Sequence, residues 1–254
     1  MTPLNLLRRH ARWLGLAWFG SGALIATPAF ANCTVSPSSG SEPTLQSTLD
    51  SLLGPDTVPV SSCIADGADS LWTTVNQVGA IQIQIELAGN AASNSFGIYD
   101  PNTNLLVPIF SGSDGAGDIA TIIVTPNGSQ WTVRTWDANS PMSSYTVSTS
   151  AFGFYLQTTQ NGGTTLYSDS SRNVGGADYM YAWGPLAGNS AGQYIIAWED
   201  SVGGDGDYQD FVAQLIDVQP VNPVPLPASV WLLASGLLLT RRWWTREPAV
   251  TRRQ

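Results

Sequence analysis

The clearest pattern in the chain is a strict alternation of apolar and polar side chains in AIQIQIELA, residues 80–88. The apolar positions are Ile81, Ile83, Ile85 and Leu87, and the polar ones Gln82, Gln84 and Glu86. A period of two residues is that of a β-strand with one buried face. The pattern therefore predicts a strand that packs on a hydrophobic core.

Further strand candidates follow at short intervals, separated by turn sequences such as DPNTN, TPNGS and QNGG. They are Phe96–Tyr99, Leu105–Phe110, Ile119–Thr125, Gln130–Trp136, Tyr145–Thr149, Phe152–Gln157, Thr164–Tyr167, Tyr179–Trp183, Gln193–Trp198 and Tyr208–Val218. Parallel strands would need helical connections between them, and no helical pattern lies between these candidates. We therefore predict an all-β fold, an antiparallel β-sandwich of jelly-roll-like type.

One short helix is expected before the strands, in TLQSTLDSLLG, residues 44–54. Its apolar positions recur at helical spacing: Leu45, Leu49, Leu52 and Leu53. Gly54 is a typical helix end.

A weak internal echo links residues 94–118 with residues 150–178. Each segment runs Phe-Gly-x-Tyr, then a turn, a strand and a loop rich in Ser, Asp and Gly. Two related strand pairs on facing sheets would explain the echo, and chance recurrence in a β protein of simple composition is the alternative.

The two ends of the chain have the pattern of targeting segments. At the start, arginines precede an apolar run, residues 13–26, and Ala29 and Ala31 occupy the small-residue positions of a signal-peptidase site. This predicts a cleaved signal peptide, residues 1–31; a membrane anchor is the alternative. At the other end, an apolar segment, 224–240, is followed by Arg241 and Arg242, which predicts a hydrophobic helix in the membrane with a cytoplasmic basic tail. Residues 32–223 then form one extracytoplasmic domain.

The charge of that domain narrows its partners and its chemistry. It holds 18 acidic residues against Arg134 and Arg172, a net charge of −16. Nucleic acid is therefore an improbable partner, and cations are favoured. The chain has no Lys, and its single His, His10, lies in the signal peptide. These absences exclude hydrolase and zinc-protease sites that depend on histidine, and they exclude catalysis by lysine. The one enzymatic alternative left is a glycosidase that uses only carboxylates, Glu199 and Asp200.

Two cysteines, Cys33 and Cys63, are expected to form one disulfide in an exported chain. A metal-binding pair is the alternative, although two thiols without histidine make a poor zinc site.

The densest group of carboxylates lies in WEDSVGGDGDYQD, residues 198–210, between two apolar strand candidates. The five acids are Glu199, Asp200, Asp205, Asp207 and Asp210. Calcium takes about 6–8 oxygen ligands, and the glycines allow tight turns with exposed carbonyls, so we predict a Ca²⁺ site here. The spacing is not that of an EF-hand. A solvated acidic hairpin loop is the alternative.

Several other features are expected to be structural. The acidic pairs Asp66/Asp69, Asp114/Asp118 and Asp169/Asp178 are interpreted as turn or surface groups, and Asn127-Gly128-Ser129 as a hairpin turn rather than a glycosylation site. The tryptophans of the strands are Trp72, Trp131, Trp136, Trp183 and Trp198. We expect them in the core, with a sugar-binding face as the alternative.

The C-terminus resembles the PEP-CTERM sorting signal of Gram-negative, exopolysaccharide-producing bacteria in its VPLPA variant. The matching residues are Val224, Pro225, Leu226, Pro227 and Ala228, the apolar run, and Arg241 and Arg242. The resemblance implies processing by an exosortase-type membrane enzyme, with transient anchoring in the inner membrane and then release or attachment at the cell surface.

Residues 152–218 are similar to the domain-of-unknown-function family 4114. The matching positions are Trp198, Glu199, Asp200, Gly203, Gly204, Asp205, Asp207, Tyr208 and Asp210, with Gln209 where Asn is usual. The resemblance implies an exported β domain with an acidic loop and no established activity.

Together these observations predict a non-enzymatic protein of the cell surface or extracellular matrix with a calcium-ordered loop. The second hypothesis is a carbohydrate-binding module for exopolysaccharide that uses exposed aromatic side chains.

Overall fold

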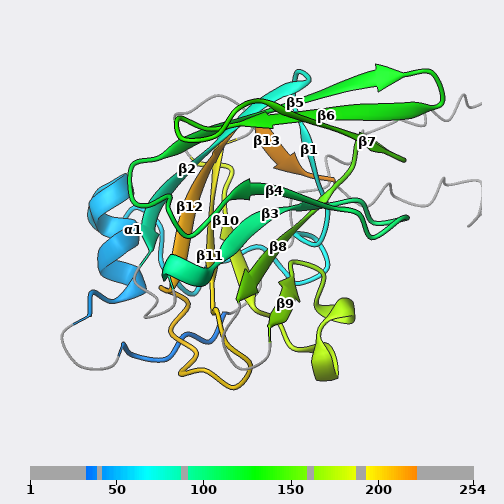
Figure 1. The fold of residues 1–254 in the computed structure, drawn as a ribbon. Helices are drawn as coiled ribbons and strands as arrows, with labels where there is room; N and C mark the ends of the chain where they lie inside the picture. Colours follow the sequence, from blue (N-terminus) through cyan, green and yellow to red (C-terminus); the bar gives the residue numbers. More distant parts are fainter. Residues whose placement is uncertain (1–32, 39–41, 87–90, 159–162, 187–192, 222–254) are drawn as a thin grey trace, which may run out of the picture.

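The computed structural model describes residues 33–38, 42–86, 91–158, 163–186 and 193–221 (Figure 1). The expected signal peptide and sorting segment therefore lie outside the described residues. Within the described ranges, no helix has the length and apolar character needed to cross a membrane.

The predicted helix is confirmed as α1 (Leu45–Leu53). The hydroxyl of Thr44 caps its first turn by accepting from the backbone N–H of Ser47, and Gly54 ends it with φ of 96°. Leu45 and Leu49 are buried, so the leucine spacing marks the face that packs on the domain.

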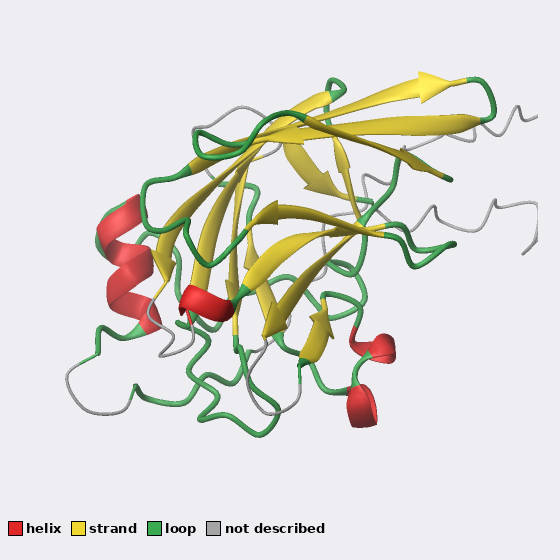
Figure 2. Ribbon diagram, viewed as in Figure 1, coloured by secondary structure: helices red, strands yellow, loops and turns green. Residues whose placement is uncertain are grey.

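The described part of the chain is otherwise built from antiparallel strands, as the alternating pattern predicted (Figure 2). The strands are β1 (Trp72–Thr74), β2 (Val78–Glu86), β3 (Ser95–Tyr99), β4 (Leu106–Phe110), β5 (Ile119–Asn127), β6 (Gln130–Trp136), β7 (Ser143–Val147), β8 (Gly153–Thr158), β9 (Thr164–Tyr167), β10 (Met180–Trp183), β11 (Gln193–Trp198), β12 (Phe211–Ile216) and β13 (Val218–Pro220). A seven-stranded sheet has the order β10-β11-β12-β2-β5-β6-β7, a four-stranded sheet the order β4-β3-β8-β9, and β1 pairs with β13. The described residues thus form a β-sandwich with one α-helix.

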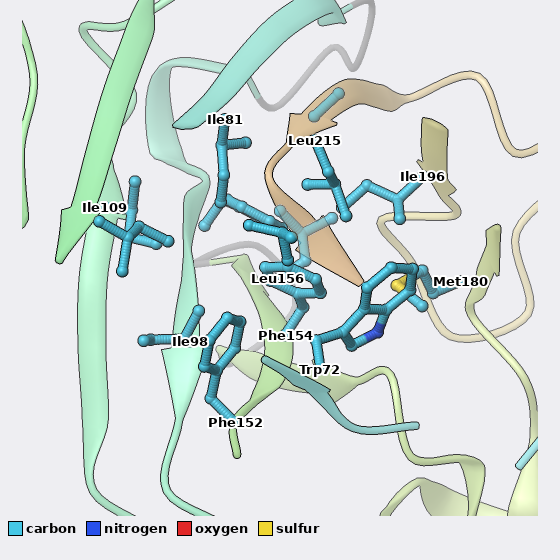
Figure 3. Packing of buried hydrophobic residues seen from close by; sticks show 14 of the residues in the cluster. Trp72, Ile81, Ile98, Ile109, Phe152, Phe154, Leu156, Met180, Ile196 and Leu215 are labelled. Carbon is cyan, nitrogen blue, oxygen red and sulfur yellow. The ribbon is translucent and has the colours of Figure 1, made fainter. Parts of the chain in front are cut away.

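The main core lies between the seven-stranded and four-stranded sheets (Figure 3). Ile81 and Ile83, from the predicted apolar face of β2, are buried in it. Trp72 and Trp198 are also fully buried there. A second cluster joins α1 to the opposite face of β10, β11 and β12 and contains the fully buried Trp183. Because both faces of β11 are covered, its sequence after Gln193, YIIAW, is continuously apolar and buried rather than alternating.

The last predicted strand, Tyr208–Val218, has the wrong bounds. Tyr208 has φ of 56° and belongs to the acidic loop, so β12 begins only at Phe211. Asp217 has φ of 55° and ends that strand, after which the chain turns to pair with β1. The short β1 was not predicted, since three residues carry too little periodicity.

The internal echo has a structural meaning, but the expectation of facing sheets is wrong. The two strand pairs lie in one sheet, where β3 and β8 are central antiparallel neighbours. Gly97 lies opposite Tyr155, and Tyr99 lies opposite Gly153. A Cβ atom on Gly97 would stand 2.7 Å from the Tyr155 ring, and one on Gly153 would overlap the Tyr99 ring. Each Phe-Gly-x-Tyr motif thus supplies the glycine that makes room for the tyrosine of the other.

The two arginines of the domain occupy different environments. Arg134 lies on β6 with its side chain exposed, while its backbone pairs with both β5 and β7. The Arg172 guanidinium lies 4.6 Å from the Tyr99 ring centroid and donates to the carbonyl oxygen of Pro101 (2.7 Å). It also pairs with Asp169.

Candidate functional site

The acidic loop, residues 199–210, connects two neighbouring antiparallel strands of the large sheet. β11 ends at Trp198 and β12 begins at Phe211, and these two residues are paired in register. The next pair outward is Glu199 and Asp210, so the hairpin itself brings two carboxylates together. The predicted position of this loop between two core strands is confirmed.

Three of the five predicted carboxylates converge. Glu199, Asp207 and Asp210 each offer an oxygen, and these oxygens all lie within 4.8 Å of one another. Glu199 is 5% exposed and Asp207 2% exposed, while Asp210 is half-buried. We call these three residues the acidic cluster.

The backbone of the loop fixes the position of Glu199. The N–H of Gly206 donates to one carboxylate oxygen of Glu199 (2.8 Å), and the Ser201 hydroxyl donates to the other (3.2 Å). A Cβ atom on Gly204 would overlap the glutamate carboxylate, so this position requires glycine. The carbonyl of Gly206 accepts from the N–H of Ser36, three residues from Cys33. The predicted Cys33–Cys63 disulfide is confirmed, with Cα atoms 6.0 Å apart, and it holds this segment against the loop.

The electrostatics of the acidic cluster favour protonation when no cation is bound. Burial raises the pKa of Asp210 to about 8, with the negative charges of Asp200 and Glu199 as further causes. Burial likewise raises the pKa values of Glu199 and Asp207. Hydrogen bonding with Glu199 raises the pKa of Asp210 further, which favours a proton shared between the two carboxyl groups. The sequence offers no positive side chain inside this loop to replace that proton.

Within the part of the chain that the structure describes, two buried amide oxygens of residues that contact Asp207 or Asp200 have no hydrogen-bond partner. Gln209 is 1% exposed; its side-chain N–H donates to Asp207 (2.7 Å), while its oxygen is unsatisfied. Asn94 is 4% exposed; its amide donates to Asp200 (3.4 Å), and its oxygen is also unsatisfied. Buried acceptors without partners are rare and costly. Amide and carboxylate oxygens are both ligands for hard cations.

The other two predicted ligands lie apart from the acidic cluster. Asp200 is buried, with one carboxylate oxygen against Asn94, and its backbone N–H donates to Asp210 (3.0 Å). Asp205 is exposed and adds negative potential. Asn94 was not predicted as a site residue, because it lies 106 residues away from its partner Asp200 in the sequence. Gln209 lies inside the acidic motif, but it was noted only as a residue that replaces the usual Asn.

Among the remaining acidic residues, three are turn groups and two lie deeper in the domain. Asp114 accepts from the N–H of Ser111, Asp118 from that of Gly115, and Asp169 caps a short 3₁₀ turn, as expected for turn residues. Asp69 and Asp178 differ from that expectation. Asp69 is 1% exposed, and burial raises the pKa of Asp178 to about 7.

The tryptophans follow the core prediction in three cases. Trp72, Trp183 and Trp198 are fully buried, whereas Trp131 and Trp136 are half-buried on β6. The exposed large apolar side chains in the described ranges are all aliphatic: Val78, Leu105, Ile119, Met142, Val174 and Val202. The described surface therefore has no row of exposed aromatic rings.

The sorting-motif residues and the signal-cleavage residues Ala29 and Ala31 lie outside the described residues. Comparison with protein-family models, curated proteins and solved structures finds no match to this chain.

Proposed function

We propose that this chain is a non-enzymatic exported protein of the cell surface or extracellular matrix whose acidic loop is ordered by Ca²⁺. Residues 1–31 direct export. Residues 224–254 hold the precursor in the inner membrane until an exosortase-type enzyme processes it. The observation that carries the calcium part is the convergence of Glu199, Asp207 and Asp210 within 4.8 Å.

The spacing of the acidic cluster suits one calcium ion. Ca²⁺–O distances are about 2.3–2.6 Å, so two oxygens on the same ion lie at most about 5 Å apart. The carboxylates therefore need no large rearrangement to share a cation. The unsatisfied oxygens of Asn94 and Gln209, together with water, are further ligand candidates toward the coordination number of about 6–8.

The energetics support the same proposal. Buried carboxylates without a positive partner are costly, and here the sequence supplies none in the loop. In the metal-free chain a shared proton relieves the repulsion between Glu199 and Asp210. A divalent cation performs this role at neutral pH, and extracellular modules bind Ca²⁺ with dissociation constants of about 10⁻⁴–10⁻³ M.

Thermal melting of the purified full-length chain in mild detergent tests the calcium site. Ca²⁺ at about 100 times its dissociation constant should add roughly 2.7 kcal/mol to the free energy of unfolding. For a domain of this size that corresponds to a rise of about 5–11 °C over the chelated sample. Glu199→Gln should remove the rise, while Asp217→Asn, at the far end of β12, should keep it. An equal melting temperature with Ca²⁺ and with chelator would refute the site and favour the solvated hairpin.

The sorting signal has a separate test in the host. Replacing Pro225 and Pro227 by alanine should leave the precursor unprocessed in the membrane fraction, because the VPLPA motif is then broken. Processing that continues unchanged in this variant would contradict the proposed role of residues 224–228.

A further inference from the structure

A hollow of about 400 Å³ lies between the β1–β2 turn and the β5–β6 hairpin. Its wall includes Trp131 of β6 and Val124 of β5, and its rim carries Asn76 and Gln77. The volume falls in the range of about 300–1,000 Å³ that small-molecule sites occupy.

Three side chains around this hollow have polar groups without a hydrogen bond to another described residue: Trp131, Asn76 and Gln77. Among the described residues, no group accepts the indole N–H of Trp131, and no other aromatic ring stacks on it. The side-chain amides of Asn76 and Gln77 are exposed and form no hydrogen bond within the described ranges. A half-buried ring with a free N–H, flanked by two free amides, presents an apolar surface with donors and acceptors at its edge.

The hollow is held open by backbone contacts rather than by mobile side chains. The N–H of Val75 donates to the carbonyl of Asp217 (2.8 Å), and the carbonyl of Gln77 accepts from the N–H of Val124 (2.7 Å). The Thr73 hydroxyl donates to the carbonyl of Ser150 (3.4 Å). The backbone of the turn is thus fixed against Asp217 and β5, so that a ligand does not have to order this backbone.

We propose that this hollow is a subsite for a neutral saccharide. A sugar ring presents an apolar C–H face, which packs on the Trp131 ring, and hydroxyl groups that exchange hydrogen bonds with Asn76, Gln77 and the indole N–H. None of the eight lining residues is charged, so the site offers no cationic group to a uronate, sulfate or phosphate. The net charge of −16 on residues 32–223 repels polyanions as well, so the ligand is an uncharged glycan.

This proposal is independent of the calcium site, and the experiment keeps the two apart. The full-length chain in mild detergent, with chelator present, is titrated with neutral hexaoses of glucose, mannose and galactose and with an oligogalacturonide of the same length. Binding is followed by calorimetry and by tryptophan fluorescence. We expect at least one neutral hexaose to bind and to shift the emission, and the oligogalacturonide to bind at least tenfold more weakly.

Variants locate the site. Asn76→Ala combined with Gln77→Gly removes two exposed amides, and glycine tolerates the φ of 66° at position 77, so the fold should stay intact and binding should weaken at least tenfold. Trp131→Ala should abolish both binding and the emission shift. Trp136→Ala, on the next half-buried tryptophan of β6, should retain both. The proposal would be overturned if no neutral hexaose bound at a concentration of about 10 mM. It would also be overturned if the amide variant bound as tightly as the parent chain.

Discussion

Asp210→Asn provides a stringent test of the electrostatics in the acidic loop, because it is expected to stabilise the metal-free protein. Asparagine has nearly the shape of aspartate; its oxygen can accept from the N–H of Asp200, and its amide can donate to Glu199. The substitution therefore replaces the shared proton by a permanent neutral group. It should also weaken the Ca²⁺ site, since one carboxylate ligand is lost.

The magnitude follows from the pKa of Asp210. Burial raises the folded-state pKa to about 8, against an unfolded value of about 3.9. At about 1.4 kcal/mol per pH unit, this sets an upper limit of about 6 kcal/mol for the effect on the free energy of unfolding. Because the side chain is half-exposed and solvent screens it, we expect about 2 kcal/mol. Between these two pKa values the folded chain holds more protons than the unfolded chain, so the stability of the parent falls as pH rises from about 4 to about 8.

The assay is thermal melting in chelator at pH 5, 7 and 9, with Asp217→Asn as the control of equal charge change. The parent and Asp210→Asn should melt within about 2 °C of each other at pH 5, and the variant should melt about 4–8 °C higher at pH 9. In saturating Ca²⁺ at pH 7 the order should reverse. Parallel pH profiles for the parent and Asp210→Asn would show that this carboxyl group is not buried against its neighbours as described.

Three further substitutions test the packing around the site. Gly153→Ala should cost at least about 2 kcal/mol in urea unfolding, since its Cβ overlaps a facing tyrosine ring, whereas Gly115→Ala, which meets open space, should cost less than about 0.5 kcal/mol. Replacing Cys33 and Cys63 by serine should lower the free energy of unfolding by about 3.6 kcal/mol for a loop of 30 residues; a loss under about 1 kcal/mol would contradict a disulfide that constrains the unfolded chain. Gly204→Ala should displace the glutamate of the acidic cluster and abolish the calcium-dependent shift in melting temperature while leaving the metal-free melting temperature within about 3 °C; an undiminished shift would contradict the tight packing of this loop.

The sequence was sufficient to predict the elements with strong periodicity. The alternation in β2, the leucine spacing of α1 and the placement of the acidic loop between β11 and β12 were all readable, because each depends on local pattern. The short β1 was not, since its partner β13 lies far along the chain and only tertiary packing selects the pair.

The membership of the acidic cluster was also beyond local pattern. The sequence presents five acids as equals, but the structure separates Asp200 and Asp205 from the other three. The loop that holds them has Tyr208 in a left-handed conformation and a contact between Gly206 and Ser36, and neither feature can be read from local pattern. Asn94 contributes through tertiary contact alone.

The placement of the two arginines has a consequence for proteolysis. Residues 32–223 contain no lysine, so trypsin-like enzymes have only the bonds after Arg134 and Arg172 to attack. The first lies within the paired backbone of β6, and the second follows a guanidinium held against the Tyr99 ring. Cleavage after Arg134 therefore requires the large sheet to open, which makes a tryptic cut at this bond a direct report of unfolding. The shortage of lysine and arginine in residues 32–223 also removes most recognition sites for an entire class of extracellular proteases.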